Sequence, residues 1–331
     1  MKSIGVDLGG HKVVAGLVAG GVIESKLEER TEPARKPGPV IAQVARMARA
    51  LGGGEEIPVG VCIPGALDAA RENAVMIANF AGWNGLPLRR MLEDAIGGRV
   101  AIENDANAYA LGEGFAEAGA ARGVNDYIMV TLGTGIGGGI VAGGRLLTGA
   151  HGMAGELGHM VLGRDEPCGP GCRGLGHFEA LCGADALERK ASEMGLWPEP
   201  EKNSLKDLWL RRKEPEVAVF WDAVLENLAR GIASLVHIFD PELVVVGGGL
   251  RKGENFMELL EERVPKYLGE PFRPALKIRP SLLDTDAPIF GGAACAHGAM
   301  AVRFTFTRSA TRTRLSAPDR SGAGAPCRVD R

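Results

Sequence analysis

The stretch YIMVTLGTGIGGGIVA, residues 127–142, contains the pattern that decides the fold. An apolar run at residues 127–132 ends in a glycine-rich turn, and a second apolar run resumes at residues 139–142. Short apolar runs bounded by glycine are typical of buried strands, so this stretch predicts two strands joined by a glycine turn. Glycine at such a turn lets the backbone approach a ligand closely, because no Cβ stands in the way.

The same pattern occurs at the start of the chain, in SIGVDLGGHKVVAGLV, residues 3–18. Residues 3–8 and 12–18 are predicted strands on either side of Gly9 and Gly10. Two copies of one supersecondary pattern indicate a duplicated α/β protein with two lobes and a cleft between them.

The rest of the chain alternates between strand-like and helix-like patterns. Apolar runs predict strands at residues 59–63, 100–103 and 243–246. Apolar residues spaced by three and four predict helices at residues 40–51, 88–96, 107–118 and 220–239. This alternation is typical of the α/β class.

The composition bounds the function. The 331 residues are enough for two domains, and 45% hydrophobic with 24% charged residues is ordinary for a globular protein. A net charge of −3 favours neither a nucleic-acid nor a membrane partner. No signal peptide and no apolar run of roughly 18–20 residues is present, so we expect a cytoplasmic protein.

Glycine is unusually frequent, with 49 residues, and much of it lies in three clusters. The clusters are Gly9 with Gly10, residues 133–139, and residues 247–249, and each follows a predicted strand. Backbone N–H groups in such turns bind phosphate oxygens, and we expect the third cluster to lie near a helix whose N-terminal dipole favours anions. For the first cluster alone, a plain hairpin turn is the alternative.

The run ENDAN, residues 103–107, follows a predicted strand and opens a predicted helix, which places its side chains at the edge of the cleft. Asn104 and Asp105 are also residue types that serve simply as helix N-caps, so this alternative stays open.

The run LGTGIGGGI at residues 132–140, followed by Gly149 and by GELGH at residues 155–159, resembles the signature of the ROK family (repressors, open reading frames and kinases). The resemblance extends from Ile4 to about Ala301. It implies the two-lobed actin/hexokinase-like, ribonuclease H-like ATPase fold, with ATP in the cleft between two α/β lobes. It also implies a C-terminal helix that returns to the N-terminal lobe.

The resemblance implies a small lobe of residues 1–108 plus about 290–302, and a large lobe of residues 109–289 that carries a zinc-binding loop. Residues 303–331 are rich in Arg, Ser, Thr, Ala, Gly and Pro without periodicity. We expect a disordered tail there, or a stretch from an altered reading frame, rather than a folded element.

In this family, the glycine turns hold ATP with Mg²⁺. Asp7 would hold Mg²⁺ through water, because Mg²⁺ gives up its water reluctantly. His11 stands where the family usually has Thr, so an imidazole that titrates near neutral pH replaces a hydroxyl. The expected nucleotide-binding residues are Asp7, Gly9, Gly10, His11, Lys12, Thr131, Gly133, Thr134, Gly135, Gly247, Gly248 and Gly249.

The resemblance also implies a sugar site. Asp105 matches the base that takes the proton from the sugar hydroxyl, and carboxylates and amides suit the hydroxyl groups of a polyol. Trp83 is expected in the core rather than at the ligand. The expected sugar-binding residues are Gly65, Asn79, Asn104, Asp105, Glu156, His159 and Glu179.

The run CGPGCRGLGHFE, residues 168–179, departs from the zinc motif of the family, Cys-x-Cys-Gly-x-x-Gly-Cys-x-Glu. The first two cysteines lie two residues further apart, and His177 replaces the third. The expected structural zinc ligands are His159, Cys168, Cys172 and His177, an S₂N₂ set. Cys182 is an alternative to Cys168, and a metal-free loop held by packing is the alternative to zinc.

The resemblance implies an ATP-dependent hexose kinase, with glucose as the first expectation and a homodimer or homotetramer as the assembly. Kinases for N-acetylmannosamine, N-acetylglucosamine, fructose or allose are alternatives. A sugar-sensing repressor is a less favoured alternative, because the first phosphate motif begins at Ile4 and leaves no room for a helix-turn-helix before it. A non-catalytic or differently employed ATPase of this fold is the third.

Overall fold

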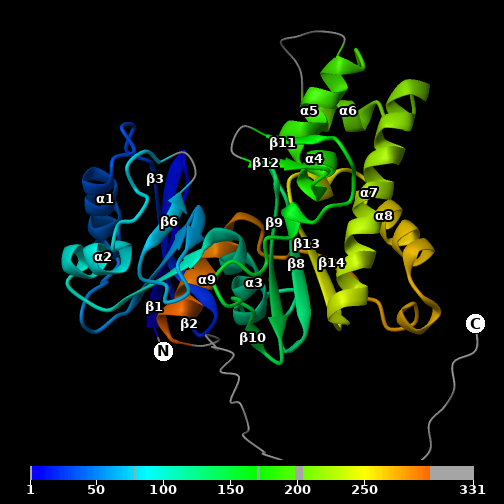
Figure 1. Cartoon of the computed structure of the whole chain (residues 1–331). Helices are drawn as coiled ribbons and strands as arrows, with labels where there is room; N and C mark the ends of the chain where they lie inside the picture. Colours follow the sequence, from blue (N-terminus) through cyan, green and yellow to red (C-terminus); the bar gives the residue numbers. More distant parts are fainter. Residues whose placement is uncertain (1, 78–79, 170–171, 198–203, 299–331) are drawn as a thin grey trace, which may run out of the picture.

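The computed structural model describes residues 2–77, 80–169, 172–197 and 204–298, which form two five-stranded sheets side by side (Figure 1). In spatial order, the first sheet consists of β3 (Val22–Arg30), β2 (Lys12–Ala19), β1 (Lys2–Leu8), β4 (Val59–Ile63) and β7 (Val100–Asn104). The second consists of β10 (Arg145–Leu146), β9 (Ile136–Ala142), β8 (Tyr127–Leu132), β13 (Leu243–Gly248) and β14 (Ile278–Pro280). Two small hairpins pair β5 (Gly65–Leu67) with β6 (Ala74–Ile77), and β11 (Pro167–Gly169) with β12 (Cys172–Leu175).

Both sheets have the same topology. In each, the first three strands along the chain are antiparallel neighbours, and two later strands are added parallel to the first. The two predicted glycine turns connect equivalent strands, β1 to β2 and β8 to β9. The duplication inferred from the sequence is therefore present in the order and direction of the strands.

Among the strands that the sequence-based prediction missed, β3 is the longest. β3 occupies residues 22–30, where charged and polar residues predominate and most side chains are exposed or half-buried. By contrast, all five residues of β4 are buried, which gives it the continuous apolar run of a central strand. β3 is an edge strand, and its charges discourage pairing with another chain.

Helices cover both sheets and fill the space between them (Figure 1). They are α1 (Pro37–Ala50), α2 (Leu88–Ile96), α3 (Asp105–Phe115), α4 (Phe178–Cys182), α5 (Ala184–Glu193), α6 (Leu205–Leu210), α7 (Pro215–Phe239), α8 (Phe256–Arg263) and α9 (Ala287–Ala296). Short 3-10 turns are η1 (Leu157–His159), η3 (Leu250–Lys252), η4 (Val264–Tyr267), η5 (Glu270–Phe272) and η6 (Asp284–Asp286). Helices α1 and α2 lie outside the first sheet, α7 and α8 outside the second, and α3 and α9 lie between the sheets (Figure 1).

Helix α9 packs directly on the backbone of the first sheet, as expected for a C-terminal helix that returns to the N-terminal lobe. Glycine makes this approach possible. A Cβ on Gly5 of β1 would lie 1.7 Å from the carbonyl oxygen of Ile289, and one on Gly60 of β4 would lie 1.8 Å from that of Gly292. Any side chain at these two strand positions would therefore push the helix away.

Some helix starts differ from the prediction, and α7 begins at Pro215, five residues before the predicted residue 220. Helix α3 begins at Asp105, two residues before the predicted start, because the Asn104 side chain accepts a hydrogen bond from the Asn107 N–H and caps the helix there. Near the third glycine cluster, where a helix is expected, the 3-10 turn η3 comes first and helix α8 begins at Phe256.

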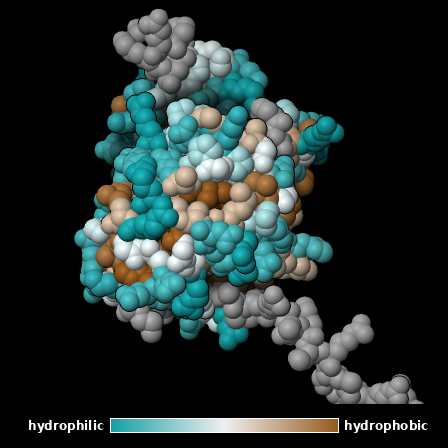
Figure 2. Space-filling view, turned by 90° about the vertical axis from the view of Figure 1, so that its left-hand side faces the viewer, coloured by the Kyte–Doolittle hydropathy of each residue, from teal (hydrophilic) through white to brown (hydrophobic). Residues whose placement is uncertain are grey.

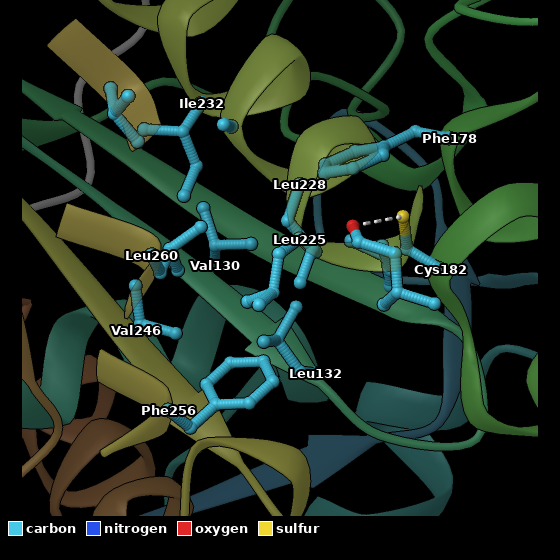
Figure 3. Packing of buried hydrophobic residues seen from close by; sticks show 14 of the residues in the cluster. Val130, Leu132, Phe178, Cys182, Leu225, Leu228, Ile232, Val246, Phe256 and Leu260 are labelled. Carbon is cyan, nitrogen blue, oxygen red and sulfur yellow. Dashed lines mark hydrogen bonds between the residues drawn. The ribbon is translucent and has the colours of Figure 1, made fainter. Parts of the chain in front are cut away.

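The core of the second lobe lies between its sheet and α7 (Figure 3). Phe178 of α4 packs against Gly231 of α7, where a Cβ would lie 2.4 Å from the ring. Cys182 is fully buried in this core and donates a weak hydrogen bond to the Val224 carbonyl at 3.8 Å. In the first lobe, Trp83 is also fully buried, as predicted.

Within the described residues, no helix combines the length and the apolar character needed to cross a bilayer. The face of the molecule on the side of α1 and α2 is largely hydrophilic, with a limited hydrophobic area (Figure 2). The prediction for residues 303–331 lies outside the described residues.

Candidate active site

A cavity of about 640 Å³ lies between the two lobes, and ten of the predicted site residues line it. Its walls come from the β5–β6 hairpin, the start of α3, the β8–β9 turn and the segment of residues 152–159. Nine predicted residues line it together: Gly65, Asn104, Asp105, Thr131, Gly133, Thr134, Gly135, Glu156 and His159, with Glu179 as a tenth. Asn79 falls outside the described residues.

Asp105 is the first residue of α3, at the point where β7 ends. Its Oδ1 accepts hydrogen bonds from the Ala106 N–H at 2.9 Å and from Asn104 Nδ2 at 3.1 Å. Burial raises the pKa of Asp105 to about 6, although the Ala106 hydrogen bond lowers it, and the negative charge of Glu156 raises it further. A carboxyl group with this pKa is ionised at neutral pH and is a better proton acceptor than an ordinary Asp.

Asn104 unites the two interpretations considered for this motif. Its Oδ1 caps α3, while its Nδ2 donates to the Gly65 carbonyl oxygen at 3.0 Å, and the side chain also lines the cavity. The cap fixes the direction in which α3 leaves the strand. It therefore also fixes where Asp105 stands in the cleft.

The β8–β9 turn lines the same cavity as Asp105, and it is closed by a hydrogen bond from the Gly133 N–H to the Gly135 carbonyl oxygen at 3.0 Å. A Cβ on Gly135 would lie 2.5 Å from Glu179 Oε2. Glycine here brings the phosphate-type turn directly beside a predicted sugar-binding carboxylate.

The first glycine turn is placed differently. Among the described residues that line this cavity or a second cavity of about 680 Å³, none belongs to the group Asp7, Gly9, Gly10, His11 and Lys12. His11 is exposed, and Lys12 forms an ion pair with Glu28 at 3.0 Å. The Thr31 hydroxyl donates to the Gly9 carbonyl oxygen at 2.7 Å, so part of this turn is held by the protein itself.

Asp7 is nevertheless electrostatically connected to the cleft. Burial raises the pKa of Asp7 to about 7, the charge of Asp105 raises it further, and Lys12 lowers it. Two half-buried carboxylates that repel one another are the donors a divalent cation would stabilise, so Asp7 would suit the role of a Mg²⁺-holding residue.

A second cavity of about 680 Å³ lies in the second lobe and shares Gly133 with the first. Its walls are mainly apolar, with Trp209 and Trp221 in a T-shaped pair whose ring centres are 5.0 Å apart. Gly249 of the third glycine cluster lines this cavity. An apolar pocket that shares a wall with a phosphate-type turn would suit a nucleotide base.

The other two residues of the third cluster serve the sheet. A Cβ on Gly248 would lie 2.1 Å from the Leu132 carbonyl oxygen, and one on Gly247 would lie 2.4 Å from the methyl group of Met129. These two glycines allow β13 to lie against β8 and its neighbours, so only Gly249 reaches the cavity wall.

The predicted zinc ligands come together beside Glu156 and Glu179, two of the predicted sugar-binding residues. One ligand atom from each of His159, Cys168, Cys172 and His177 lies within 4.8 Å of all the others. The two His Nδ1 atoms are 3.0 Å apart, and Cys172 Sγ is 3.5 Å from His177 Nδ1. Two sulfur and two nitrogen donors at this spacing fit a tetrahedral Zn²⁺. The alternative with Cys182 is wrong, because that thiol lies in the core.

The cluster also contacts two carboxylates that the sequence predicts to bind the sugar. The Cys168 thiol donates to Glu179 Oε1 at 2.8 Å. His159 lies between two carboxylates, with Nε2 3.8 Å from Glu156 Oε2 and Nδ1 3.9 Å from Glu179 Oε1. The loop that would hold the metal therefore positions the acidic side chains of the cleft.

Several residues of the site have no signal in the sequence. Tyr109 lines the first cavity from α3, and Met153 lines it from the loop before Glu156. Trp209 lines the second cavity from α6. Aromatic residues at helical spacing are indistinguishable from core and surface positions until the helix is docked.

This arrangement defines the class of the protein: a two-lobed α/β protein of the ATPase fold type, with a polar cleft and an apolar pocket that meet at a glycine turn. The comparisons with known proteins are more specific. The family model of the ROK family matches residues 3–299. A glucokinase of Thermotoga maritima is 39% identical over 312 residues, covering 88% of this chain and 96% of the relative.

Solved structures agree. The ROK hexokinase of Thermus thermophilus has a TM-score of 0.76 at 37% identity, covering 90% of this chain and 98% of its own. A ROK family glucokinase of Streptomyces griseus, in complex with glucose and AMPPNP, has a TM-score of 0.73 at 29% identity, covering 90% and 100%. The chain belongs to the ROK family. The family and the fold predicted from the sequence are therefore confirmed.

Proposed function

We propose that the protein is an ATP-dependent hexose kinase that converts glucose and ATP into glucose 6-phosphate and ADP. The observation that carries this is the placement of Asp105. Its carboxylate shares one cavity with the β8–β9 glycine turn and with Glu156, His159 and Glu179, and Gly133 joins that cavity to the apolar pocket. A phosphate held by the turn and a sugar hydroxyl held by the carboxylates would meet beside Asp105.

In this mechanism, Glu156, His159 and Glu179 accept and donate hydrogen bonds to the ring hydroxyls, while Asn104 and Gly65 complete the wall. Asp105 accepts the proton of the attacking sugar hydroxyl. The hydroxyl oxygen bonds to the γ-phosphorus as the bond between that phosphorus and ADP breaks. Catalysis of phosphoryl transfer depends mainly on positioning the reactants and stabilising charge, so these contacts would provide most of the rate enhancement. Mg²⁺, when bound with ATP, would neutralise the phosphate charge, and Asp7 is the residue that would hold it through water.

A structural Zn²⁺ belongs to the same proposal. The S₂N₂ set would hold it, and its role is to fix the loop that carries His159 and lies against Glu179. The reaction would take place in the cytoplasm, and a homodimer or homotetramer is the proposed assembly.

The test is hexose-dependent release of ADP from ATP, measured in a coupled assay with glucose, N-acetylmannosamine, N-acetylglucosamine, fructose and allose. We expect the largest kcat/KM with glucose. A larger value with another hexose would change the substrate and keep the reaction. ATP hydrolysis at the same rate without any hexose, or glucose binding without ADP release, would contradict the kinase proposal.

A further inference from the structure

Arg71 lies in the turn between β5 and β6, outside the group of residues predicted from the sequence, and its backbone is held in an unusual conformation. Its φ of 54° lies in the left-handed region, which non-glycine residues seldom adopt unless their surroundings hold them there. The turn is fixed by Asp68, whose carbonyl oxygen accepts the Arg71 N–H at 2.9 Å and whose side chain accepts the N–H groups of Glu72 and Asn73. This conformation points the arginine at a buried carboxylate.

The guanidinium group forms an ion pair with Glu103 through two of its nitrogen atoms. Arg71 Nε donates to Glu103 Oε2 at 2.9 Å, and Nη2 lies 2.8 Å from Oε1. The side chains are only 15% and 7% exposed, so solvent does little to screen this pair. Breaking one partner of such a pair leaves the other charge buried and unpaired.

Glu103 is in turn hydrogen-bonded to the N-cap and the first turn of α3. Its Oε1 accepts the Asn104 N–H at 2.9 Å and Asn107 Nδ2 at 3.0 Å. Asp105 stands between these two residues in the chain. Fixing Glu103 therefore fixes the direction of the strand end and the helix start from which the Asp105 carboxylate projects.

The third guanidinium nitrogen of Arg71, Nη1, contacts the other lobe. Nη1 donates to the Gly152 carbonyl oxygen at 3.0 Å, and to that of Asp68 at 3.2 Å. The two segments are in close contact here, since a Cβ on Gly152 would lie 2.6 Å from Arg71 Nη1 and 2.9 Å from the Leu67 carbonyl oxygen. Gly152 begins the stretch that lines the cavity and leads to Glu156.

We propose that Arg71 is a positioning residue that ties the sugar-binding loop of residues 152–156 to the strand end that presents Asp105, and so sets the distance between the bound hexose and the base. One guanidinium links three segments from two lobes. A single ammonium group cannot make the same set of contacts, because it lacks the planar fork. The inference rests on the proposed hexose kinase activity.

The test compares Arg71→Lys and Arg71→Gln with the control Arg89→Lys. Arg89 forms an exposed pair with Glu72, the neighbour of Arg71 in the same turn, at 2.9 Å. We expect Arg71→Lys to lower kcat/KM for glucose about 10- to 100-fold, because misplacement of about 1 Å has effects of this size. Arg71→Gln should lose more, while the KM for ATP stays within about twofold in both and Arg89→Lys behaves as wild type.

Hydrogen–deuterium exchange provides a readout that does not need catalysis. Arg71→Lys should increase exchange in peptides covering residues 149–156, and leave peptides covering residues 127–132 unchanged. Wild-type kcat/KM for glucose in Arg71→Lys, or an equal loss in Arg89→Lys, would overturn the proposal. Failure of both Arg71 variants to fold would also overturn it, because the residue would then serve stability alone. If wild-type protein shows no hexose-dependent ADP release, the function fails, and the exchange experiment still decides whether Arg71 ties the loop.

Discussion

At the scale of single residues, Asp105 has a raised pKa and lines the same cavity as the β8–β9 turn and the predicted sugar-binding residues Glu156 and His159. We expect Asp105→Asn to fold and to lower kcat about 10²- to 10⁴-fold, because the amide cannot accept a proton. Steady-state kinetics with glucose and circular dichroism of the variant are the measurements. Near-normal turnover by a correctly folded variant would remove Asp105 from the mechanism.

The same pKa predicts a pH profile. The reaction needs the ionised carboxylate, so kcat/KM for glucose in the wild type should fall as the pH drops below about 6. A profile that stays flat down to pH about 4.5, near the ordinary range of carboxyl groups, would show that Asp105 is not raised or not required.

As the pH rises, ionisation of Asp105 should lower the free energy of unfolding, whereas it raises kcat/KM. The folded-state pKa of Asp105, about 6, lies above the ordinary value of 3.8, so the folded state holds the proton more tightly than the unfolded state. This group therefore favours folding fully below pH 3.8, and the contribution is lost as the pH rises through about 6. Asp105→Asn should be more stable than wild type at pH 8, by on the order of 1–3 kcal/mol, and the difference should shrink toward pH 4. Urea unfolding at both pH values is the measurement.

At the scale of elements, α9 can lie on the first sheet only because the strands present glycine. Gly60→Ala places a Cβ 1.8 Å from the Gly292 carbonyl oxygen, which requires the helix to move. We expect a loss of at least about 2 kcal/mol in the free energy of unfolding. Gly38→Ala in α1 is the matched control, because its Cβ meets no atom within 4 Å, and it should be neutral or slightly stabilising. Equal urea midpoints for the two variants would contradict this account of the packing.

The β11–β12 loop is the second element whose order we expect to depend on a few side chains. Cys172→Ser should abolish stoichiometric zinc, lower the melting temperature and raise the KM for glucose about tenfold, because His159 and Glu179 lose their support. Elemental analysis, thermal unfolding and kinetics measure the three effects. Cys295→Ser, outside the cluster, should keep its metal. Purified wild-type protein that holds no zinc, even after refolding with the metal, would contradict the zinc proposal.

At the scale of the whole molecule, the site is divided between two lobes with the same topology, so its geometry depends on how far they are apart. We expect glucose with a non-hydrolysable ATP analogue to bring the lobes together, because closure excludes water from the transferred phosphate. A smaller radius of gyration in solution scattering would record this closure. Identical scattering curves with and without both ligands would contradict it.

The sequence by itself determined the local features. Apolar runs that end in glycine specified the paired strands around residues 9–10 and 133–135, and ENDAN at 103–107 specified a polar strand-to-helix junction. These signals are local, because a strand, a turn and a cap each depend on residues a few positions apart. The four expected zinc ligands also come together in the structure, since most of them lie within one short loop.

Only the tertiary structure decided what depends on contacts between distant segments. β3 is held by its place beside β2, Trp209 becomes a cavity wall when α6 docks, and Arg71 meets Glu103 and Gly152 across 32 and 81 residues of chain. A charged strand, an aromatic residue on a helix and an arginine in a turn look ordinary in sequence. Their roles arise from burial and from partners that the folded chain brings together, and no local pattern encodes those partners.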